Sequence, residues 1–524
     1  MQEALKIIEG SRKGYKTSST CIQEIHGRVT DELVIALCGA IGSGATTVGE
    51  KIQKILEEYG YDVVYIKLSD FIKQCSTKED FVKELEGSSI ADRYLMLQDE
   101  GNSLREMYSN DVLAQLAIFK ISMDREKSEK EKKSDAAEVK AHTVRRFATI
   151  VDSLKHPDEW RLLQTVYGKM FYLFGVLCPE NIRKERLIGQ KKIDRAASAQ
   201  LIERDKMEEI NSGQKFIKTI FHADFFIRNI KNIKNALNDP LKRYIGLILS
   251  DNKYTPTIHE YAMHIAQASA HRSSCLSRQV GAAIIGHNGE IVSTGRNDVP
   301  KFGGGLYGDG EQETYNCYNT GGCKNDEYKN DIFKQLAAIL RKKFPLSVKD
   351  EMIKTALDEI KKNTKLKDII EFSRAVHAEM DAITSAARSG AHGLEGATLY
   401  CTTFPCHHCA RHIVASGIKR VFYIEPYEKS LAYELHSDSI VLDSDDIEIN
   451  GDKVKFLPFE GVAPKQFTSI FRDRDKKSDG CSIEIDLRRS KPILQQLMDS
   501  FVDYEDRVVK RLKETGLLEK LVAD

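Results

Sequence analysis

Four residues in two short segments constrain the fold more than any other feature of this chain. His377 and Glu379 lie in one segment, and Cys406 and Cys409 follow in the second. One imidazole and two thiolates are typical ligands of a borderline-soft metal such as Zn²⁺, and three protein ligands leave a fourth tetrahedral position for water. The fold must therefore bring both segments around one metal ion, with Glu379 beside the metal as a proton carrier.

Both segments are expected to begin helices. Cys406 and Cys409 are spaced i and i+3, so they share one helix face, and Pro405 suits a helix start. The macrodipole at that end favours thiolate sulfur. His377 likewise precedes an apolar segment with helical periodicity, and a strand is predicted between the two helices at 397–402. This arrangement favours a catalytic metal centre over a structural zinc knuckle or reduced core cysteines.

The composition indicates a soluble, cytoplasmic chain that does not enter a membrane. Of the 524 residues, 41% are apolar and 30% charged, and no run of about 18 apolar residues occurs. The N-terminus lacks the pattern of a signal peptide, and the 11 cysteines do not suggest a disulfide framework. The formal net charge is zero, which favours a small-molecule substrate over a long nucleic acid and leaves local RNA contacts open.

The N-terminal half is predicted to be a phosphate-binding α/β domain. A buried-strand pattern at 33–38 leads into a glycine-rich turn and an amphipathic helix at 48–59, the order of a Walker A loop. The position of the usual lysine holds Ala45, so binding of a nucleotide with Mg²⁺ is favoured over rapid phosphoryl transfer. The candidate nucleotide-binding residues are Gly39, Gly42, Ser43, Gly44, Ala45, Thr46, Thr47 and Asp152.

The rest of this half alternates strands with helices, which predicts a parallel, doubly wound sheet. Asp152 ends a strand, where it could hold Mg²⁺ or cap a helix before Pro157. Arg183 and Arg186 resemble the lid-side arginines of nucleoside-monophosphate-kinase-like proteins; they could supply the charge that the loop lacks, or be ordinary surface residues. The further strands are predicted at 62–67, 147–152, 171–177 and 223–229.

The C-terminal half is predicted to form an α/β sandwich. A helix at 258–271 precedes a hairpin of strands at 279–285 and 290–295, and the two metal-binding helices then alternate with further strands. An insertion at 300–373 separates the hairpin from His377; its first part is turn-rich and its second part helical and lysine-rich.

Several motifs of this half together resemble the cytidine and deoxycytidylate deaminases. They are SRQVGAAI at 277–284, GRN at 295–297, HAEMDAI at 377–383, PCHHCA at 405–410 and YEK at 427–429. With the P-loop domain in front, the whole chain resembles the antiviral deoxycytidine-nucleotide deaminases of bacteria. The resemblance implies zinc-dependent hydrolytic deamination of dCTP and dCMP, and a regulatory nucleotide or small RNA that keeps the enzyme off until infection.

The resemblance also implies roles for individual residues. His377, Cys406 and Cys409 would hold zinc, and Glu379 would move the proton. Asn297 matches an asparagine that hydrogen-bonds the nucleotide sugar, with a simple turn as the alternative. Asp381 replaces the family's usual asparagine, and because a carboxylate repels phosphate, the preference for mono- or triphosphate stays open. The candidate substrate-binding residues are Arg278, Asn297, Asp381, Tyr427 and Lys429.

A second metal site is a further prediction from the same family. Cys275 aligns with a cysteine that holds a structural zinc in some deoxycytidylate deaminases, and Cys317 and Cys323 could complete that site. His271 is the candidate fourth ligand. The alternative is a set of free thiols in a loop.

The predicted organisation has four parts and a homo-oligomer is expected. The tail should carry an amphipathic helix from Pro492 and pack against the deaminase domain or an oligomer partner, with an RNA contact of its basic clusters as the alternative. The charge run at 123–134 is expected to be a solvated helix face or a connector. The parts are an N-terminal segment at 1–30, the P-loop domain at 31–250, the deaminase domain at 251–466 and the tail at 467–524.

Two other functions fit the same residues. A deaminase of tRNA or single-stranded DNA would use the same metal chemistry, although the neutral charge and the GRN motif count against it. A nucleotide-responsive binding switch, in which the P-loop domain drives partner assembly, would make deamination secondary. A comparison of turnover of free nucleotides with turnover of an oligonucleotide distinguishes the polynucleotide deaminase from a deaminase of free nucleotides.

Overall fold

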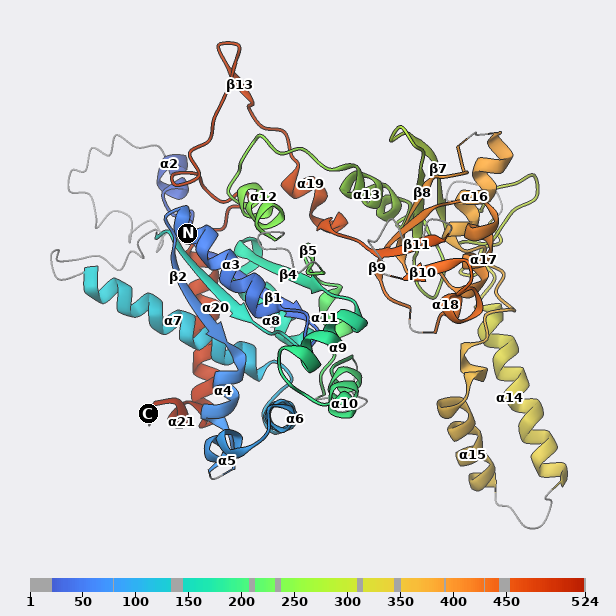
Figure 1. Ribbon diagram of the computed structural model, residues 1–524, viewed down its shortest axis with the longest axis horizontal. Helices are drawn as coiled ribbons and strands as arrows, with labels where there is room; N and C mark the ends of the chain where they lie inside the picture. Colours follow the sequence, from blue (N-terminus) through green and yellow to red (C-terminus); the bar gives the residue numbers. More distant parts are fainter. Residues whose placement is uncertain are drawn as a thin grey trace, which may run out of the picture.

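The protein, described by a computed structural model, forms two six-stranded sheets, each covered by helices (Figure 1). No helix of the described residues is long and apolar enough to cross a membrane. The described residues are 21–78, 80–132, 145–206, 213–230, 237–308, 314–343, 350–390, 393–427, 429–442 and 453–522.

The N-terminal sheet has the order β12-β5-β4-β1-β3-β2. Strands β1 to β5 run parallel to their neighbours, and β12 is antiparallel at one edge. Every residue of β1 is buried, as expected for a central parallel strand with helices on both faces. The parallel sheet is therefore confirmed. Its strands are β1 Leu33–Gly39, β2 Asp62–Lys67, β3 Phe147–Asp152, β4 Phe171–Leu177, β5 Phe225–Arg228 and β12 Gly461–Val462.

Alternate residues of β1 belong to two separate cores, one on each face of the sheet. The predicted order of strand, glycine-rich loop and helix is present: β1 ends at Gly39 and α3 begins at Ala45. Gly44 caps α3 with a φ of 81°, a conformation that glycine adopts without strain. The helices of this half are α2 Cys21–His26, α3 Ala45–Glu58, α4 Leu68–Cys75, α5 Phe81–Gly87, α6 Ile90–Met107, α7 Val112–Lys132, α8 Pro157–Tyr167, α9 Glu180–Gly189, α10 Arg195–Lys206, α11 Phe216–Ile220 and α12 Asn238–Ile248.

The C-terminal sheet has the order β10-β11-β9-β8-β6-β7. Ala283 and Ile285 of β6 pack in the core that includes α13, whereas Ala282 and Ile284 pack in the core of α16 and α17. The helices therefore cover opposite faces, which confirms the predicted α/β sandwich. Its elements are α13 Ile258–Ala270, β6 Gly281–Ile285, β7 Ile291–Arg296, α16 Ala378–Ser389, β8 Thr398–Thr403, α17 His407–Ala415, β9 Arg420–Glu425, α18 Ala432–Leu435, β10 Ile440–Leu442 and β11 Val454–Pro458.

Helix α16 packs unusually close to β7 because a glycine lies between them. A Cβ built on Gly295 would lie 2.1 Å from the Ala378 carbonyl oxygen and 2.4 Å from the Ala382 nitrogen. Only a residue without a side chain allows that approach. The predicted zinc ligand His377 and proton carrier Glu379 lie at the start of α16. The close contact of α16 with β7 therefore sets how near these two residues lie to the sheet.

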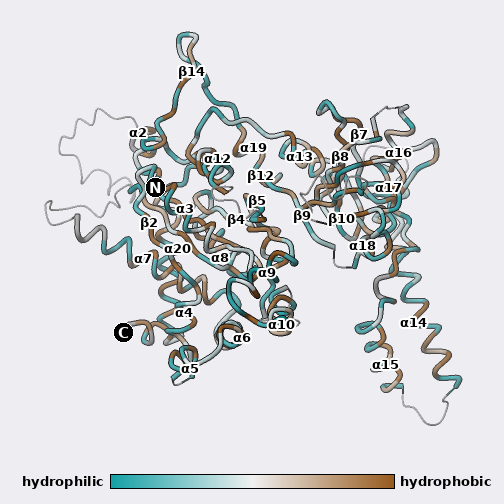
Figure 2. The backbone as a smooth tube through the Cα atoms, in the orientation of Figure 1, coloured by the Kyte–Doolittle hydropathy of each residue, from teal (hydrophilic) through white to brown (hydrophobic). Residues whose placement is uncertain are grey.

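The insertion forms a helical hairpin. Helices α14 (Lys324–Lys343) and α15 (Asp350–Asn363) pack on one another and project away from the sheets (Figure 1). Both alternate between hydrophilic and hydrophobic residues along their length (Figure 2). The second, helical part of the insertion is thus as predicted.

The helices of the tail pack on the N-terminal half, whereas Phe467 at the start of the tail stacks on His264 of α13 in the deaminase half, with ring centroids 4.1 Å apart. Helix α20 (Asp499–Glu514) crosses and packs on α7, and α21 (Leu517–Val522) packs on α4 (Figure 1). Phe501 of α20 is fully buried. The tail packs there because α20 buries apolar side chains against helices that lie far away in the sequence. No local sequence pattern encodes such a contact. The remaining short elements of the tail are α19 Phe467–Ile470, β13 Lys477–Ser478 and β14 Cys481–Ser482.

The charge run at 123–134 is only partly a solvated face. Arg125 is buried and pairs with Glu32 at 2.8 Å and with Glu505 of α20 at 3.2 Å. Residues 133–134 lie outside the described residues. One cation of the run therefore ties the tail to the N-terminal sheet.

Glu260, in the first turn of α13, links the two halves. Its carboxylate accepts hydrogen bonds from Arg243 of α12 at 2.7 Å and from the backbone N–H of Val462 in β12 at 2.9 Å. Since β12 pairs with β5, one buried carboxylate joins the first helix of the C-terminal half to the N-terminal sheet.

Candidate active site

The predicted metal ligands meet at the starts of two helices. His377 is the N-cap residue of α16 and Cys406 that of α17, with Cys409 in the first turn. Cys406 Sγ lies 3.3 Å and Cys409 Sγ 3.5 Å from His377 Nδ1, and the three atoms all lie within 4.8 Å of one another. Both cysteines are buried.

The chemistry of this donor set fits Zn²⁺. Hydrogen bonds with Cys409 and His377 lower the pKa of the Cys406 thiol, so a thiolate forms there readily. One imidazole nitrogen and two sulfurs at this spacing are ligands that a tetrahedral zinc ion takes, with one position left over. When bound, zinc would supply Lewis-acid activation of a water molecule.

Glu379 lies two residues after the histidine and is 4% exposed. Burial raises the pKa of its carboxyl group, and the Cys406 sulfur acts in the same direction. A raised pKa makes a carboxylate a better proton acceptor, which suits proton transfer.

A cavity of about 400 Å³ opens onto these groups. Its size falls within the range of ligand pockets, about 300–1,000 Å³. Most of the predicted residues line it, whereas Cys409 and Asp381 do not. The predicted residues that line it are His377, Glu379, Cys406, Asn297, Arg278, Tyr427, Lys429, Cys275, Cys317 and Cys323.

Asn297 and Asp381 are both engaged by the backbone. Asn297 Oδ1 accepts from the Val280 N–H at 2.7 Å, and its Nδ2 donates to the Arg278 carbonyl at 2.7 Å. Asp381 Oδ2 accepts from the Arg296 N–H at 3.0 Å. Asn297 therefore holds the strand ends that border the cavity, and Asp381 fixes α16 to β7. Their roles toward substrate stay predictions.

Arg278 is paired with a residue that the sequence alone did not single out. Its guanidinium lies 3.2 Å from Glu425 at the end of β9. Burial raises the pKa of Glu425, and Arg278 opposes that shift. Because β9 lies beside β8, the parallel register brings Glu425 to this rim; no local motif marks it.

The insertion contributes cations to the cavity that were also missed. Lys324 and Lys329 of α14 and Arg374, just before His377, line it. Arg374 donates to the Tyr315 carbonyl at 3.2 Å. The lysine-rich composition of the insertion was visible in the sequence, but its return to the cavity depends on the helical hairpin.

The three further cysteines lie around one side of the cavity. Burial raises the pKa of Cys275 and of Cys317, and the charge of Cys323 acts in the same direction on both. Their sulfurs do not form a set with mutual distances within 4.8 Å, whereas His377, Cys406 and Cys409 do, as does one other group in the described ranges, Glu371, His407 and His408. The second metal site stays a prediction.

The glycine-rich loop borders a separate cavity of about 520 Å³. Thr46 Oγ1 donates to Asp152 Oδ2 at 2.8 Å, as a magnesium-binding pair would require. Asp152 does not cap α8; His156 is the N-cap residue. Ser43 of the loop is fully buried and does not line this cavity. The predicted residues that line this cavity are Gly39, Gly42, Gly44, Ala45, Thr46, Thr47 and Asp152.

Arg183 and Arg186 hold the loop from outside rather than being ordinary surface arginines. Arg183 Nη1 donates to the Ile41 carbonyl at 3.4 Å, and Arg186 Nη1 to the Ser43 carbonyl at 3.3 Å. Arg186 also lines the cavity. A role of either arginine toward phosphate stays a prediction.

Comparison with known proteins matches the C-terminal half. Residues 256–425 match the cytidine and deoxycytidylate deaminase zinc-binding region. The deoxycytidylate deaminase of Enterobacteria phage T4 is 33% identical over 172 residues, 32% of this chain and 78% of the relative. That of Enterobacteria phage T2 is 31% identical over 175 residues, 32% of this chain and 80% of the relative.

A crystal structure of a dCMP deaminase from the cyanophage S-TIM5 is also similar, at 20% identity over 39% of this chain and 100% of that chain, with a TM-score of 0.21. The matched region contains the cysteine and histidine cluster together with Glu379. The chain belongs to the cytidine and deoxycytidylate deaminase family, and it is a zinc-dependent hydrolytic deaminase.

Proposed function

We propose that the chain converts deoxycytidine nucleotides, dCMP and dCTP, to deoxyuridine nucleotides. The observation that carries the proposal is the charge of the cavity that holds Glu379 and the zinc ligands. Five cationic side chains line it against two carboxylates, which suits a phosphorylated substrate. The cations are Arg278, Lys324, Lys329, Arg374 and Lys429.

Glu379 is the proton carrier of the proposed reaction. Its carboxylate takes a proton from the attacking water and delivers it to the ring nitrogen; it then takes the proton of the hydroxyl group added to the ring carbon and delivers it to the amino group, which leaves as ammonia. Burial raises the pKa of its carboxyl group, which favours a group that accepts a proton and then donates it. His377 and the two cysteines fix the centre beside which this transfer takes place.

We infer that the insertion selects for the longer phosphate chain. Lys324 and Lys329 of the insertion, with Arg374 directly after it, line the cavity in addition to Arg278 and Lys429; Arg278 pairs with Glu425 and Lys324 with Glu327. A triphosphate carries more charge than a monophosphate and gains more from these cations. The preference for dCTP therefore rests on the insertion, and dCMP depends more on Arg278 and Lys429.

The test is turnover of dCMP, dCTP, deoxycytidine and a cytosine-containing oligonucleotide by the purified protein. Lys324→Ala and Arg374→Ala should raise KM for dCTP about tenfold or more, since charge-assisted contacts contribute about 1.5–3 kcal/mol. Lys334→Ala, a solvated lysine of the same helix α14, is the matched control. Efficient turnover of the nucleoside or the oligonucleotide would overturn the assignment to free nucleotides.

We also propose that the N-terminal half is a P-loop domain of the nucleoside-monophosphate-kinase type that binds a nucleotide and regulates the deaminase in defence against phage. The cavity at the glycine-rich loop and the Thr46 to Asp152 pair support nucleotide binding. Glu260 supplies a physical link between the halves. Deamination measured with and without ATP, dTTP or co-purified RNA tests regulation, and phage plating on cells that carry Glu379→Gln tests defence.

A further inference from the structure

A lysine from outside the glycine-rich loop reaches its start. Lys155, in the turn between β3 and α8, donates from Nζ to the Gly39 carbonyl at 2.8 Å. Its side chain is 16% exposed, so the charge is largely removed from solvent. The loop itself carries Ala45 where a lysine is usual, and Lys155 lines the same cavity.

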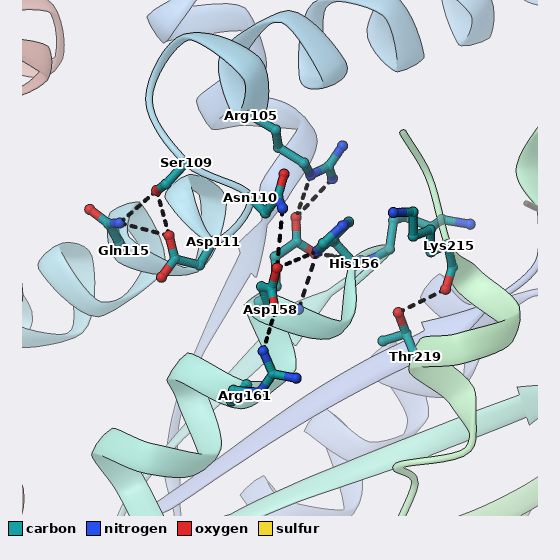
Figure 3. Close-up of polar contacts among 12 residues, drawn as sticks. Arg105, Ser109, Asn110, Asp111, Gln115, His156, Asp158, Arg161, Lys215 and Thr219 are labelled. Atoms are coloured by element: carbon teal, nitrogen blue, oxygen red, sulfur yellow. Dashed lines mark hydrogen bonds and ion pairs between the residues drawn. The ribbon is translucent and has the colours of Figure 1, made fainter. Parts of the chain in front are cut away.

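The turn that carries Lys155 is fixed by one buried carboxylate. Glu159 Oε2 accepts from the backbone N–H groups of Lys155 at 2.9 Å and His156 at 3.1 Å. Its other oxygen binds the buried guanidinium of Arg105 at 2.8 Å. Figure 3 shows Arg105 and His156 on either side of this contact at the start of α8. Lys155 is therefore held in place by its backbone and keeps its ammonium group free to change partner.

The present partner of Lys155 is an anion that also contacts the loop. Asp205 of α10 lies 2.7 Å from Lys155 Nζ, and its second oxygen accepts from the Ile41 backbone N–H at 2.6 Å. Backbone N–H groups of such a loop are the donors that bind phosphate oxygens. Asp205 thus contacts one cation and one N–H group of the loop. These are the two contacts that a phosphate would make.

Two further observations indicate a ligand in this cavity. Five cationic side chains and two carboxylates line it, so its charge favours an anion that carries more than one negative charge. Gln98 of α6 also lines it and is 7% exposed, and its side-chain oxygen has no hydrogen-bond partner among the described residues. A buried acceptor without a partner costs free energy, which a ligand that donates a hydrogen bond would recover.

We propose that Lys155 takes the place of the lysine missing from the glycine-rich loop, and that Asp205 is an internal counter-anion that the phosphate chain of a nucleoside di- or triphosphate displaces. This inference rests on the proposed nucleotide-binding role of the N-terminal half. In the free protein the Ile41 backbone N–H donates its hydrogen bond to Asp205. In the bound protein a phosphate takes that donor and Lys155, while Thr46 and Asp152 hold the magnesium ion.

The experiment is calorimetric titration of the full chain with Mg²⁺ and inorganic tripolyphosphate. All variants carry Arg278→Gln and Lys429→Gln, which weaken phosphate binding in the deaminase cavity. Lys155→Met should weaken binding about ten- to a hundredfold, and Lys155→Arg should restore most of it, because the charge returns. Lys184→Met, a solvated lysine of α9 paired with Glu180, is the matched control.

Asp205→Asn should have the opposite effect and tighten binding about tenfold, because the competing charge is removed while the side-chain shape is kept. A misfolded variant cannot bind more tightly, so this arm separates the proposal from a loss of structure. If Lys155→Met behaves as Lys184→Met does, or if Asp205→Asn weakens binding, the proposal is overturned. Turnover of dCMP by the parent chain is measured separately, so failure of the proposed deamination is distinguishable from failure of this binding site.

Discussion

The contact between β7 and α16 allows the effect of one methyl group on catalysis to be worked out. In Gly295→Ala the new Cβ would lie 2.1 Å from the Ala378 carbonyl oxygen, where real Cβ contacts stay above 3.0 Å. Both atoms nearest to it belong to backbone, so no side chain can move aside. Helix α16 must therefore retreat by roughly 1 Å, the gap between those two distances.

That displacement acts directly on the active site because His377 caps α16 and Glu379 lies in its first turn. A misplacement of about 1 Å near reacting groups can cost about a hundredfold in rate, and overpacking costs about 1–3 kcal/mol of stability. We expect kcat/KM for dCMP to fall about a hundredfold, with a lower melting temperature and a folded circular dichroism spectrum.

Gly322→Ala is the matched control, since a Cβ there meets no atom within 4 Å. It should leave turnover and melting temperature unchanged. If Gly295→Ala keeps the rate of the unaltered protein, the close approach of α16 does not set the position of Glu379, and the geometric argument fails.

Three other predictions concern the metal, the proton and the tail. Glu379→Gln should keep zinc, measured by metal analysis, and lose about 10²–10⁴-fold in kcat; normal turnover with full zinc would place the proton route elsewhere. Cys409→Ala should lose zinc and activity together, because two ligands remain; full zinc content would contradict the ligand assignment. Burial raises the pKa of Glu505 to about 7, so the folded state favours the protonated carboxyl, and its stability should fall as pH rises from the usual value of 4.5 through 7. Between pH 4.5 and 7, Glu505→Gln should therefore lose less stability than the unaltered protein, as measured by melting curves. An equal loss in both proteins would show that other groups dominate.

The strands and helices that form repeated βα units could be predicted because their buried runs and turns are local. β2, β3 and β4 have the predicted bounds, and His377 and Cys406 cap the two expected helices. The zinc cluster follows from the same local signals, because ligand spacing and helix starts are both readable in one stretch of chain.

Features that depend on distant segments could not be predicted. β12 has two residues, too few for any periodicity, and it joins the sheet of the other half. Glu425 binds Arg278 only because β9 and β8 lie side by side. Asp205 is an ordinary helical aspartate in sequence, and its contact with Ile41 exists only in the folded chain.

The route of the chain has a consequence for synthesis. The N-terminal half receives β12, which pairs with β5, and α20, which packs on α7 and α8, from residues made after the deaminase sheet. During translation, the catalytic half can reach its own fold while the other half still lacks an edge strand and the helix that buries Phe501. A chain that ended between these points would carry all three zinc ligands and Glu379 on an N-terminal half that lacks its edge strand and α20.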